Sequence, residues 1–306
     1  MADFTREEIE EKLEKYRELI AAREEEDEFI DEPNEEGVEE EKEDEPEDEP
    51  EDEPNEESAE EKTISKDIEI PDQEDNDEAV EEESTLENIF DEKDLSGLDL
   101  SGLNFHGISL RKTNLKNTDL SGCTLAESNL DQANLDQANL SDADLKNISC
   151  LEGVMTRANM ESANFQGAKL LGTDFSESNL DGAIFRKSKC METKLVRCNL
   201  NETDFSNSDF SRANLQDAKI TNSDLSRARF NNADFERTDL TDSRLSMGVF
   251  FEVNFKSANL NRALIKGAKL AGGIFTDARL PRADITGADL TDAKFHNADL
   301  SRSKLN

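Results

Sequence analysis

The sequence of 306 residues has no tryptophan, one tyrosine and only two histidines. His106 and His296 stand far apart in the chain, and neither belongs to a motif that joins histidine to a nucleophile or to a second metal ligand. No glycine-rich phosphate-binding loop is present either. The chain lacks the residue combinations that common enzyme classes need. We therefore expect no catalytic residues, no cofactor and no metal site.

Long apolar runs are also missing. No stretch approaches the ~18 apolar residues that a membrane-spanning helix requires. The N-terminus, Met1-Ala2-Asp3-Phe4-Thr5, has neither the basic segment nor the apolar run of a secretory signal. We expect a cytoplasmic protein without a membrane partner; export by a machine that needs no such signal stays open.

Cysteine is scarce, and so are basic residues relative to acidic ones. Cys123, Cys150, Cys190 and Cys198 do not have the spacing of a disulfide framework or a zinc site. All four fall on positions that we expect to face inward, so they are predicted to be buried free thiols.

Acidic residues outnumber lysine and arginine by 74 to 35, which argues against a nucleic-acid partner.

The negative charge is concentrated at one end. Residues 1–90 hold 43 acidic and 8 basic residues, whereas residues 91–306 hold 31 and 27. The low isoelectric point therefore describes an acidic leader, and the remaining two thirds of the chain are nearly neutral.

What the sequence has in abundance is a five-residue rhythm. From Leu95 to Leu305 every fifth residue is apolar, at 43 positions in one unbroken frame. A helix cannot use this pattern, because five steps of about 100° drift by about 140° in each repeat. Two positions before each of these central residues stands a small residue in 38 of the 43 repeats. On an extended chain these two positions face the same side, so we expect both to point inward.

The residue between them should then face outward, and it is Asp or Asn in 25 of the 43 repeats. The two remaining residues of each repeat must turn a corner. Ten of the 13 glycines of this stretch stand two residues after a central residue, where glycine tolerates the positive φ of a tight turn. If each corner is a right angle, four repeats close a coil of 20 residues, and the prism is about 50 Å long.

The repeats resemble the pentapeptide-repeat family, whose motif is Ala-(Asp/Asn)-Leu-x-x. Near-perfect copies are Ala133-Asn134-Leu135-Asp136-Gln137 and Ala288-Asp289-Leu290-Thr291-Asp292. The resemblance covers about two thirds of the chain and implies an all-β fold, a right-handed quadrilateral β-helix. The 20-residue coil that it implies would stack Phe235, Phe255, Phe275 and Phe295 in one column. It would also place Arg157, Glu177, Arg197, Asp217 and Arg237 in an outward column of alternating sign.

The leader divides into three parts. Residues 1–23 are predicted to contain a short amphipathic helix from residue 5, with a Thr5–Glu8 capping box. Its apolar stripe would dock on a partner, a second copy or the open end of the solenoid, or the helix would be partly formed in solution. Residues 24–84 have the composition of a disordered acidic segment. Residues 85–94 are predicted to form an N-terminal cap, and residues 95–306 are predicted to form the β-helix.

Two surface features are candidate partner-binding sites. Arg262, Arg282 and Arg302 share one outward column, and stacked like charges favour an anionic ligand such as an acidic segment, for example the leader of this chain. The alternative is a solvated column screened by salt. Val249 and Phe251 should face outward side by side, as apolar residues at interfaces do.

These observations favour a non-catalytic protein-interaction scaffold that presents ladders of side chains on a rigid prism. Its partner is a protein of unknown identity, and the open C-terminal coil suggests a homodimer. One alternative is a secretion-associated adaptor or effector, because residues 94–103 are similar to the opening of repeat regions in type VI secretion adaptors. Another is a gyrase-binding DNA mimic, as in some members of the family. The nearly neutral repeats, the uninterrupted frame and the missing C-terminal dimer helix argue against that mimic.

Overall fold

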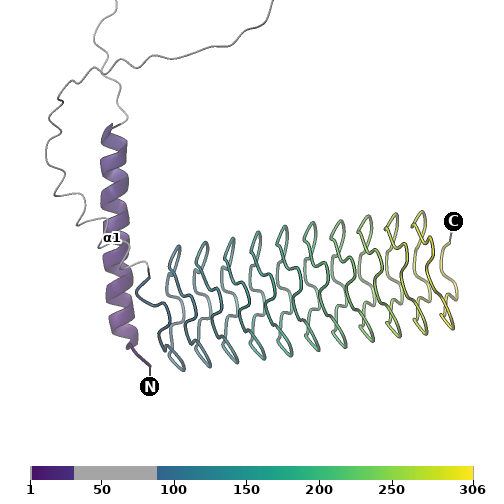
Figure 1. The fold of residues 1–306 in the computed structure, drawn as a ribbon, viewed down its shortest axis with the longest axis horizontal. Helices are drawn as coiled ribbons and strands as arrows, with labels where there is room; N and C mark the ends of the chain where they lie inside the picture. Colours follow the sequence, from purple (N-terminus) through teal and green to yellow (C-terminus); the bar gives the residue numbers. More distant parts are fainter. Residues whose placement is uncertain (1, 31–87, 306) are drawn as a thin grey trace, which may run out of the picture.

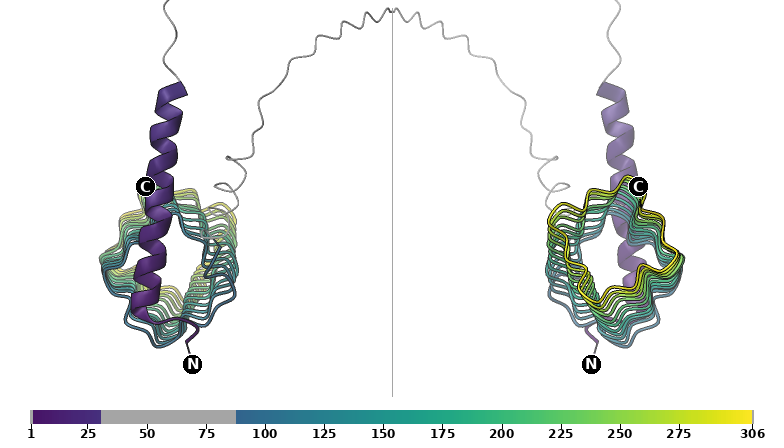
Figure 2. Two further views of the ribbon diagram at one scale, coloured as in Figure 1. Left: turned by 90° about the vertical axis from the view of Figure 1, so that its left-hand side faces the viewer. Right: turned by 90° about the vertical axis from the view of Figure 1, so that its right-hand side faces the viewer.

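The computed structural model describes residues 2–30 and 88–305, with side chains described up to residue 22 in the first range. It consists of one helix, α1 (Arg6–Ile30), and a long prism of stacked coils (Figure 1). Viewed along its length, the prism has a closed outline, and α1 crosses the opening at its N-terminal end (Figure 2). No helix in the described part of the chain combines the length and the apolar character needed to cross a membrane.

The coil has the predicted period of 20 residues. Parallel bridges join each outward residue to the residue 20 positions later, from Asp94↔Asn114 to Asp284↔Lys304. Four repeats therefore make one turn of the chain. Each bridge is a single residue, because the backbone turns a corner on either side of it. The prism thus has four walls, which we number by the first bridge residue on each: Asp94, Asp99, Asn104 and Ser109.

All corners of the prism share one backbone conformation, of which the glycines in the sequence indicated only a part. The residue two after each central position has a positive φ in all 43 corners from Glu92 to Arg302, and 33 of these residues are not glycine. The corner is a β-turn closed by a backbone hydrogen bond, as from the Thr113 N–H to the Leu110 carbonyl at 3.2 Å, with Lys112 at φ 55°. A left-handed conformation costs a non-glycine residue roughly 1–2 kcal/mol, so many corners hold strain that packing offsets.

The outward Asp and Asn residues support these corners. The Asp99 Oδ1 accepts a hydrogen bond from the Ser101 N–H at 3.0 Å, and the same two-residue pattern recurs along the prism. Asparagines of the second wall also form a ladder between coils, in which Asn159 donates to Asn139 at 3.1 Å and Asn179 donates to Asn159 at 3.0 Å. The frequent Asp or Asn between the two inward positions therefore has a structural role.

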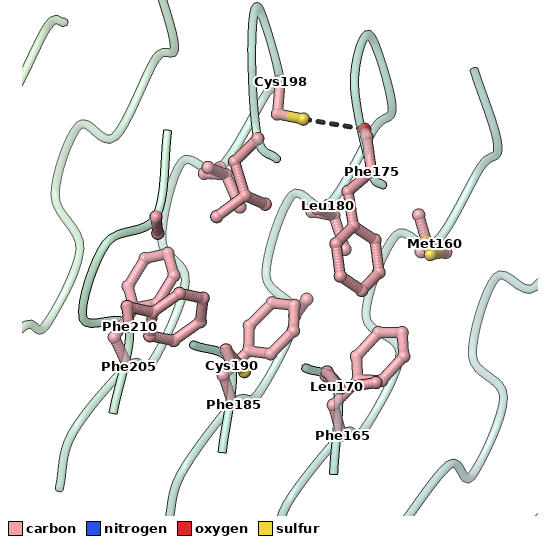
Figure 3. Close-up of a cluster of buried hydrophobic side chains, with 14 of the residues drawn as sticks. Met160, Phe165, Leu170, Phe175, Leu180, Phe185, Cys190, Cys198, Phe205 and Phe210 are labelled. Atoms are coloured by element: carbon pink, nitrogen blue, oxygen red, sulfur yellow. Dashed lines mark hydrogen bonds between the residues drawn. The ribbon is translucent and has the colours of Figure 1, made fainter. Parts of the chain in front are cut away.

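The interior is filled by the central residues. The predicted column of phenylalanines is present: Phe255 and Phe275 have ring centroids 5.2 Å apart, and Phe275 stacks on Phe295 at 4.6 Å. A second column stacks Phe165, Phe185 and Phe205 (Figure 3). Central residues from Phe90 to Ile285 are buried, which confirms the predicted inward register.

All four cysteines are free and buried, as predicted. The Cys198 thiol donates to the Phe175 carbonyl at 2.9 Å (Figure 3). Burial raises the pKa of Cys123 to about 11 and that of Cys150 to about 12, because a thiolate cannot be solvated in the core. These cysteines pack as small apolar residues.

Helix α1 closes the N-terminal end of the prism. This end was one of the surfaces on which the apolar stripe of the helix was expected to dock. Ile9 and Leu13 are buried against the first coil, and Phe4 makes an edge-on contact with Phe90 at 5.7 Å. The predicted capping box is present, with the Thr5 N–H donating to Glu8 at 2.7 Å and the Glu8 N–H donating to the Thr5 hydroxyl at 3.2 Å.

The helix is longer than the sequence predicted. It continues past residue 23 to Ile30, through a run of glutamates that are good helix formers. Residues 24–30, which we expected to be disordered, are therefore helical, and residues 31–84 of that segment lie outside the described residues. Of the predicted cap, residues 88–94 are described, and Phe90 fills the first central position.

Candidate interaction surface

The described residues do not gather the groups of a reaction centre. No cluster of three or more potential metal ligands occurs in residues 2–30 and 88–305. His106 and His296 lie at corners near opposite ends of the prism. Because side chains fill the interior, what the molecule offers to other molecules is its outer surface.

The predicted arginine column is less uniform than expected. Arg262 forms a bidentate ion pair with Asp242, which precedes it by one coil in the same column. That carboxylate raises the pKa of Arg262 by hydrogen bonding. Arg282 and Arg302 form no ion pair with a described residue; together with Arg279 they line a shallow polar hollow of about 470 Å³. The three-residue column is thus reduced to two free guanidinium groups.

The other predicted column of alternating charge is partly confirmed. Arg237 forms a bidentate pair with Asp217 at 2.7 and 2.9 Å, and Arg197 approaches Glu177 at 3.5 Å. Arg157, however, turns away from this column to the neighbouring Asp136 at 2.5 Å. Position within a column therefore predicts proximity, while rotamers decide which pairs form.

Asp136 is one of the two most enclosed carboxylates among the described residues; like Asp284, it has only 8% of its side chain exposed. Burial by itself would raise its pKa. Hydrogen bonds from Arg157, Gln137, Thr156 and Lys116 overcome that effect and hold the pKa well below its usual range. This cluster ties neighbouring coils together at one corner, so we assign it to stability.

The two predicted apolar residues lie on the fourth wall. Val249 is half-buried at a bridge position, and Phe251 is 38% exposed at the adjacent corner. We define the fourth-wall strip as the bridge residues of this wall with the corner residues two positions to either side, for example Met247, Val249 and Phe251.

Other exposed apolar side chains gather on the same strip. Leu171, Met191 and Met247 are 40%, 38% and 62% exposed. With Phe251 they make up four of the seven large apolar side chains that are exposed among the described residues. The strip occupies only three of the twelve outward columns of the prism, so this gathering marks the wall as a distinct surface.

The fourth-wall strip also carries a local excess of bases. Between residues 167 and 271 it carries six bases and a single acid, Asp209. The bases are Lys169, Lys187, Lys189, Arg227, Arg229 and Lys269, all of them exposed, on four of the six successive coils that the strip crosses there. None of them forms an ion pair with a described residue, whereas Arg186 and Arg212 just outside the strip pair with Asp204 and Glu192.

Basic and apolar residues of the strip share one hollow of about 370 Å³. Its lining includes Lys187, Lys189, Arg227 and Arg229, together with Met191 and one acid, Asp209. Lys169 and Lys189 are bridge partners on adjacent coils, where like charges about 5 Å apart are unfavourable, whereas Asp209 lies between Lys189 and Arg229. One acid among six bases leaves the strip with an excess of positive charge next to exposed apolar surface.

Sequence reasoning found only Val249 and Phe251 on this surface. The signal for the rest was available, because writing the sequence in rows of 20 brings Lys169, Lys189 and Arg229 into one column. Each of these residues occurs singly within its own repeat, so no single repeat shows the group. The closed coil brings them onto one wall, with Asp209 between Lys189 and Arg229.

A second, smaller hollow lies between α1 and the first coil. It has a volume of about 190 Å³ and is lined mainly by apolar groups, including Leu13, Tyr16, Ile20 and Ile108. His106 borders it. Arg17 and Asn104 also line the hollow, and the Arg17 guanidinium donates to the Asn104 carbonyl at 2.8 Å, so it serves to hold the helix against the first coil.

Comparison with solved structures identifies several repeat proteins of related architecture. HetL, a pentapeptide repeat protein involved in heterocyst differentiation regulation in Nostoc sp. strain PCC 7120, is 23% identical, with 69% of this chain and 88% of HetL covered and a TM-score of 0.42. A pentapeptide repeat protein of the Arabidopsis thaliana thylakoid lumen is 32% identical over 32% of this chain and 69% of its own, with a TM-score of 0.32. QnrB1, a plasmid-mediated fluoroquinolone resistance protein, is 18% identical, with 68% and 91% covered and a TM-score of 0.21.

These scores are too low to carry an argument about function, and no curated protein matches the sequence. The family models are more informative. The model of a pentapeptide repeat region matches residues 158–235. The model of pentapeptide repeats in eight copies matches residues 89–117, 113–149, 221–256, 249–287 and 275–306. With the 20-residue coil, the inward central residues and matches over about two thirds of its length, the chain belongs to the pentapeptide-repeat family.

Proposed function

We propose that this protein is a non-catalytic protein-interaction scaffold, a right-handed four-sided prism that binds its partner along the fourth wall. The observation that carries the proposal is the coincidence, on one wall, of unpaired bases such as Lys189 and Arg229 with exposed apolar residues such as Met191. Protein interfaces combine charged groups with exposed apolar side chains, whereas a surface that contacts only water gains nothing from exposed apolar side chains.

The prism is suited to hold such a surface rigidly. Each coil is joined to the next by backbone hydrogen bonds on every wall, such as the Lys189 N–H to the Ala168 carbonyl at 2.8 Å and the Asp209 N–H to the Ser188 carbonyl at 3.0 Å. Little conformational freedom of the backbone remains to be lost on binding, which favours affinity. The scaffold thus supplies a preorganised surface.

The chemistry of the strip favours an acidic partner segment with a few apolar side chains. Carboxylates of the partner would form ion pairs with the four bases, Lys187, Lys189, Arg227 and Arg229. Apolar side chains of the partner would cover Met191 and its neighbours. Electrostatic attraction would speed association and make it sensitive to salt. A basic wall is the reverse of the negative surface that a DNA mimic presents, which adds to the case against gyrase binding. No feature of the described residues favours a role in secretion over this one.

The expected homodimer through the C-terminal coil remains a separate proposal. Leu290, Phe295 and Leu300 are only partly buried there, unlike the central residues of inner coils. A second copy docked on this coil would cover them. Sedimentation velocity over a range of concentrations tests the proposal, with a concentration-dependent dimer as the expected result and a monomer throughout as the contrary one.

The fourth-wall assignment is tested by comparing two variants of matched charge. In the first, Lys187, Lys189, Arg227 and Arg229 are replaced by Gln. In the control, the same number of bases is removed from other walls, by replacing Lys219, Arg244, Arg279 and Lys294. Partners are captured from a cell extract and identified by mass spectrometry. We expect one or more acidic proteins that the wild type and the control capture and the first variant does not; equal capture by both variants would refute the assignment.

A further inference from the structure

We propose that the acidic segment of this same chain, residues 31–87, binds the fourth-wall strip and competes there with the partner. This inference rests on the proposed function, since it names a ligand for the same surface. The occupant is specific: the segment that joins Ile30 of α1 to Asn88, acting within its own molecule.

Charge complementarity is the first argument. Residues 31–87 contain 31 acidic and 3 basic residues, and the strip presents six bases and one acid between residues 167 and 271. The third wall also carries bases near its C-terminal end, but three of them, Arg262, Lys266 and Lys304, are paired with carboxylates. The segment also has apolar residues among its acids, at Ile64, Ile68 and Ile70. These match the exposed apolar side chains of the strip in kind.

The path of the chain is the second argument. The segment re-enters the described structure at Asn88, and Ile89 occupies the first position of the column that continues through Lys169, Lys189 and Arg229. The acidic segment is thus attached at one end of the wall that carries the bases. At ~4.8 Å per coil, Lys189 lies about 24 Å from Ile89, and a segment of this length can span far more than that. Attachment also raises the effective concentration of the segment at the wall.

The arginine column predicted from sequence is a weaker site for the same ligand. Arg262 is already paired with Asp242, so two guanidinium groups of that column remain. Arg302 lies about 50 Å from Ile89, at the far end of the prism. The larger and nearer group of bases is the one on the fourth wall.

Occupation by the leader would regulate access to the wall. An external acidic partner must displace the segment, so its apparent affinity is reduced by the fraction of molecules in which the wall is free. Salt would weaken both interactions. The acidic leader would thereby also protect the exposed apolar residues of the strip from non-specific contacts.

Carbodiimide cross-linking of the full chain tests the inference. The reagent joins a lysine Nζ to a carboxylate in contact with it as an amide, and mass spectrometry locates the link. We expect residues 31–87 to be linked mainly to Lys169, Lys187 and Lys189 and rarely to Lys219 and Lys294, which report on other walls. A mixture of isotopically light and heavy protein should show that both halves of each link come from one molecule.

A variant with Arg227 and Arg229 replaced by Gln keeps the reporting lysines and should lose most of these links. Links spread evenly over all walls, links concentrated at Lys294 and Lys304, or links between light and heavy chains would each overturn the inference. Glutamate-specific protease gives a second measurement: cleavage within residues 31–87 should be several-fold faster in the variant than in the wild type. If the leader is not linked while fourth-wall variants still lose their partner, the inference fails and the proposed function stands. If the leader is linked to the fourth wall but the fourth-wall variants keep their partner, the inference stands and the proposed function fails.

Discussion

The Arg6 guanidinium donates a hydrogen bond to the backbone carbonyl of Ser101 at 3.1 Å. In each later coil the equivalent carbonyl accepts a backbone N–H from the coil before it, as that of Ser121 does from Gly102 at 2.9 Å. Arg6 also donates to the Asp99 carbonyl at 3.1 Å, and Arg17 donates to the Asn104 carbonyl at 2.8 Å. Side chains of α1 thus take the place of a coil that is absent, and the edge of the prism is covered.

Replacing Arg6 by Ala should therefore loosen the N-terminal end of the prism. It removes the donors for two edge carbonyls and the ion pair with Asp99. Hydrogen exchange measured by mass spectrometry should show faster exchange in α1, with the central coils unchanged. Glu14→Ala, on the exposed side of the helix, is the control and should leave exchange as in the wild type. Unchanged protection of α1 in the Arg6 variant would contradict this description of the cap.

Corner residues provide a test of backbone strain. At Gly122 an added Cβ would meet nothing within 4 Å, but φ is +63°. Gly122→Ala should then lower the free energy of unfolding by about 1 kcal/mol through the backbone alone. Glu127 has the same φ of 63°, so Glu127→Gly should be neutral or stabilise by about 0.5 kcal/mol. Urea unfolding measures both. A loss of stability in the second variant would show that its corner is not strained.

Small polar residues of the interior differ in whether they have a partner. The Ser223 hydroxyl donates to the Leu200 carbonyl at 2.8 Å and accepts from the Thr203 N–H at 3.2 Å. The hydroxyl of Ser128, at an equivalent inward position, is buried without a hydrogen-bond partner in the described structure. Ser223→Ala should cost about 1 kcal/mol of unfolding free energy, and Ser128→Ala should be neutral or stabilising. Equal losses in the two variants would count against the assigned hydrogen bonds.

Acid should weaken the prism through its enclosed carboxylates. Hydrogen bonds from Thr286 and Lys266 lower the pKa of Asp284 to about 2, and that of Asp136 is held lower still. A lowered folded-state pKa gives stability that is complete above the unfolded value of ~3.9 and is lost as pH falls toward the folded value. Asp136→Asn should reduce stability at pH 7 and flatten its fall below about pH 4. Asp142→Asn, at an exposed corner, is the control; an unaltered acid profile in the first variant would contradict the prediction.

Much of the fold could be predicted from the sequence because the interior repeats without interruption. Phe275 must meet Phe295 once the coil has 20 residues, a period that the family resemblance implied and the five-residue frame alone did not fix. The corner conformation at Lys112 could not be read in the same way, since only glycine signals a positive φ. The register of the walls follows from which residues must be buried.

The details of the surface were less predictable. Arg157 lies in a column with Glu177 but pairs with Asp136, because a long side chain can reach a neighbouring column that offers a buried acceptor. The docking of α1 was one alternative among several, since Ile9 and Leu13 would suit any apolar surface. The fourth-wall strip depends on residues 20 apart in sequence, so it becomes visible only when the coil is closed.

The measurement that most directly tests the central claim is the affinity of a captured partner for the wild type and for the two four-base variants. We expect the fourth-wall variant, which lacks Lys187, Lys189, Arg227 and Arg229, to bind at least about tenfold more weakly, or about 1.4 kcal/mol. The control, which lacks Lys219, Arg244, Arg279 and Lys294, should bind as the wild type does. Equal affinity of all three proteins would contradict the claim that this wall is where the prism meets its partner.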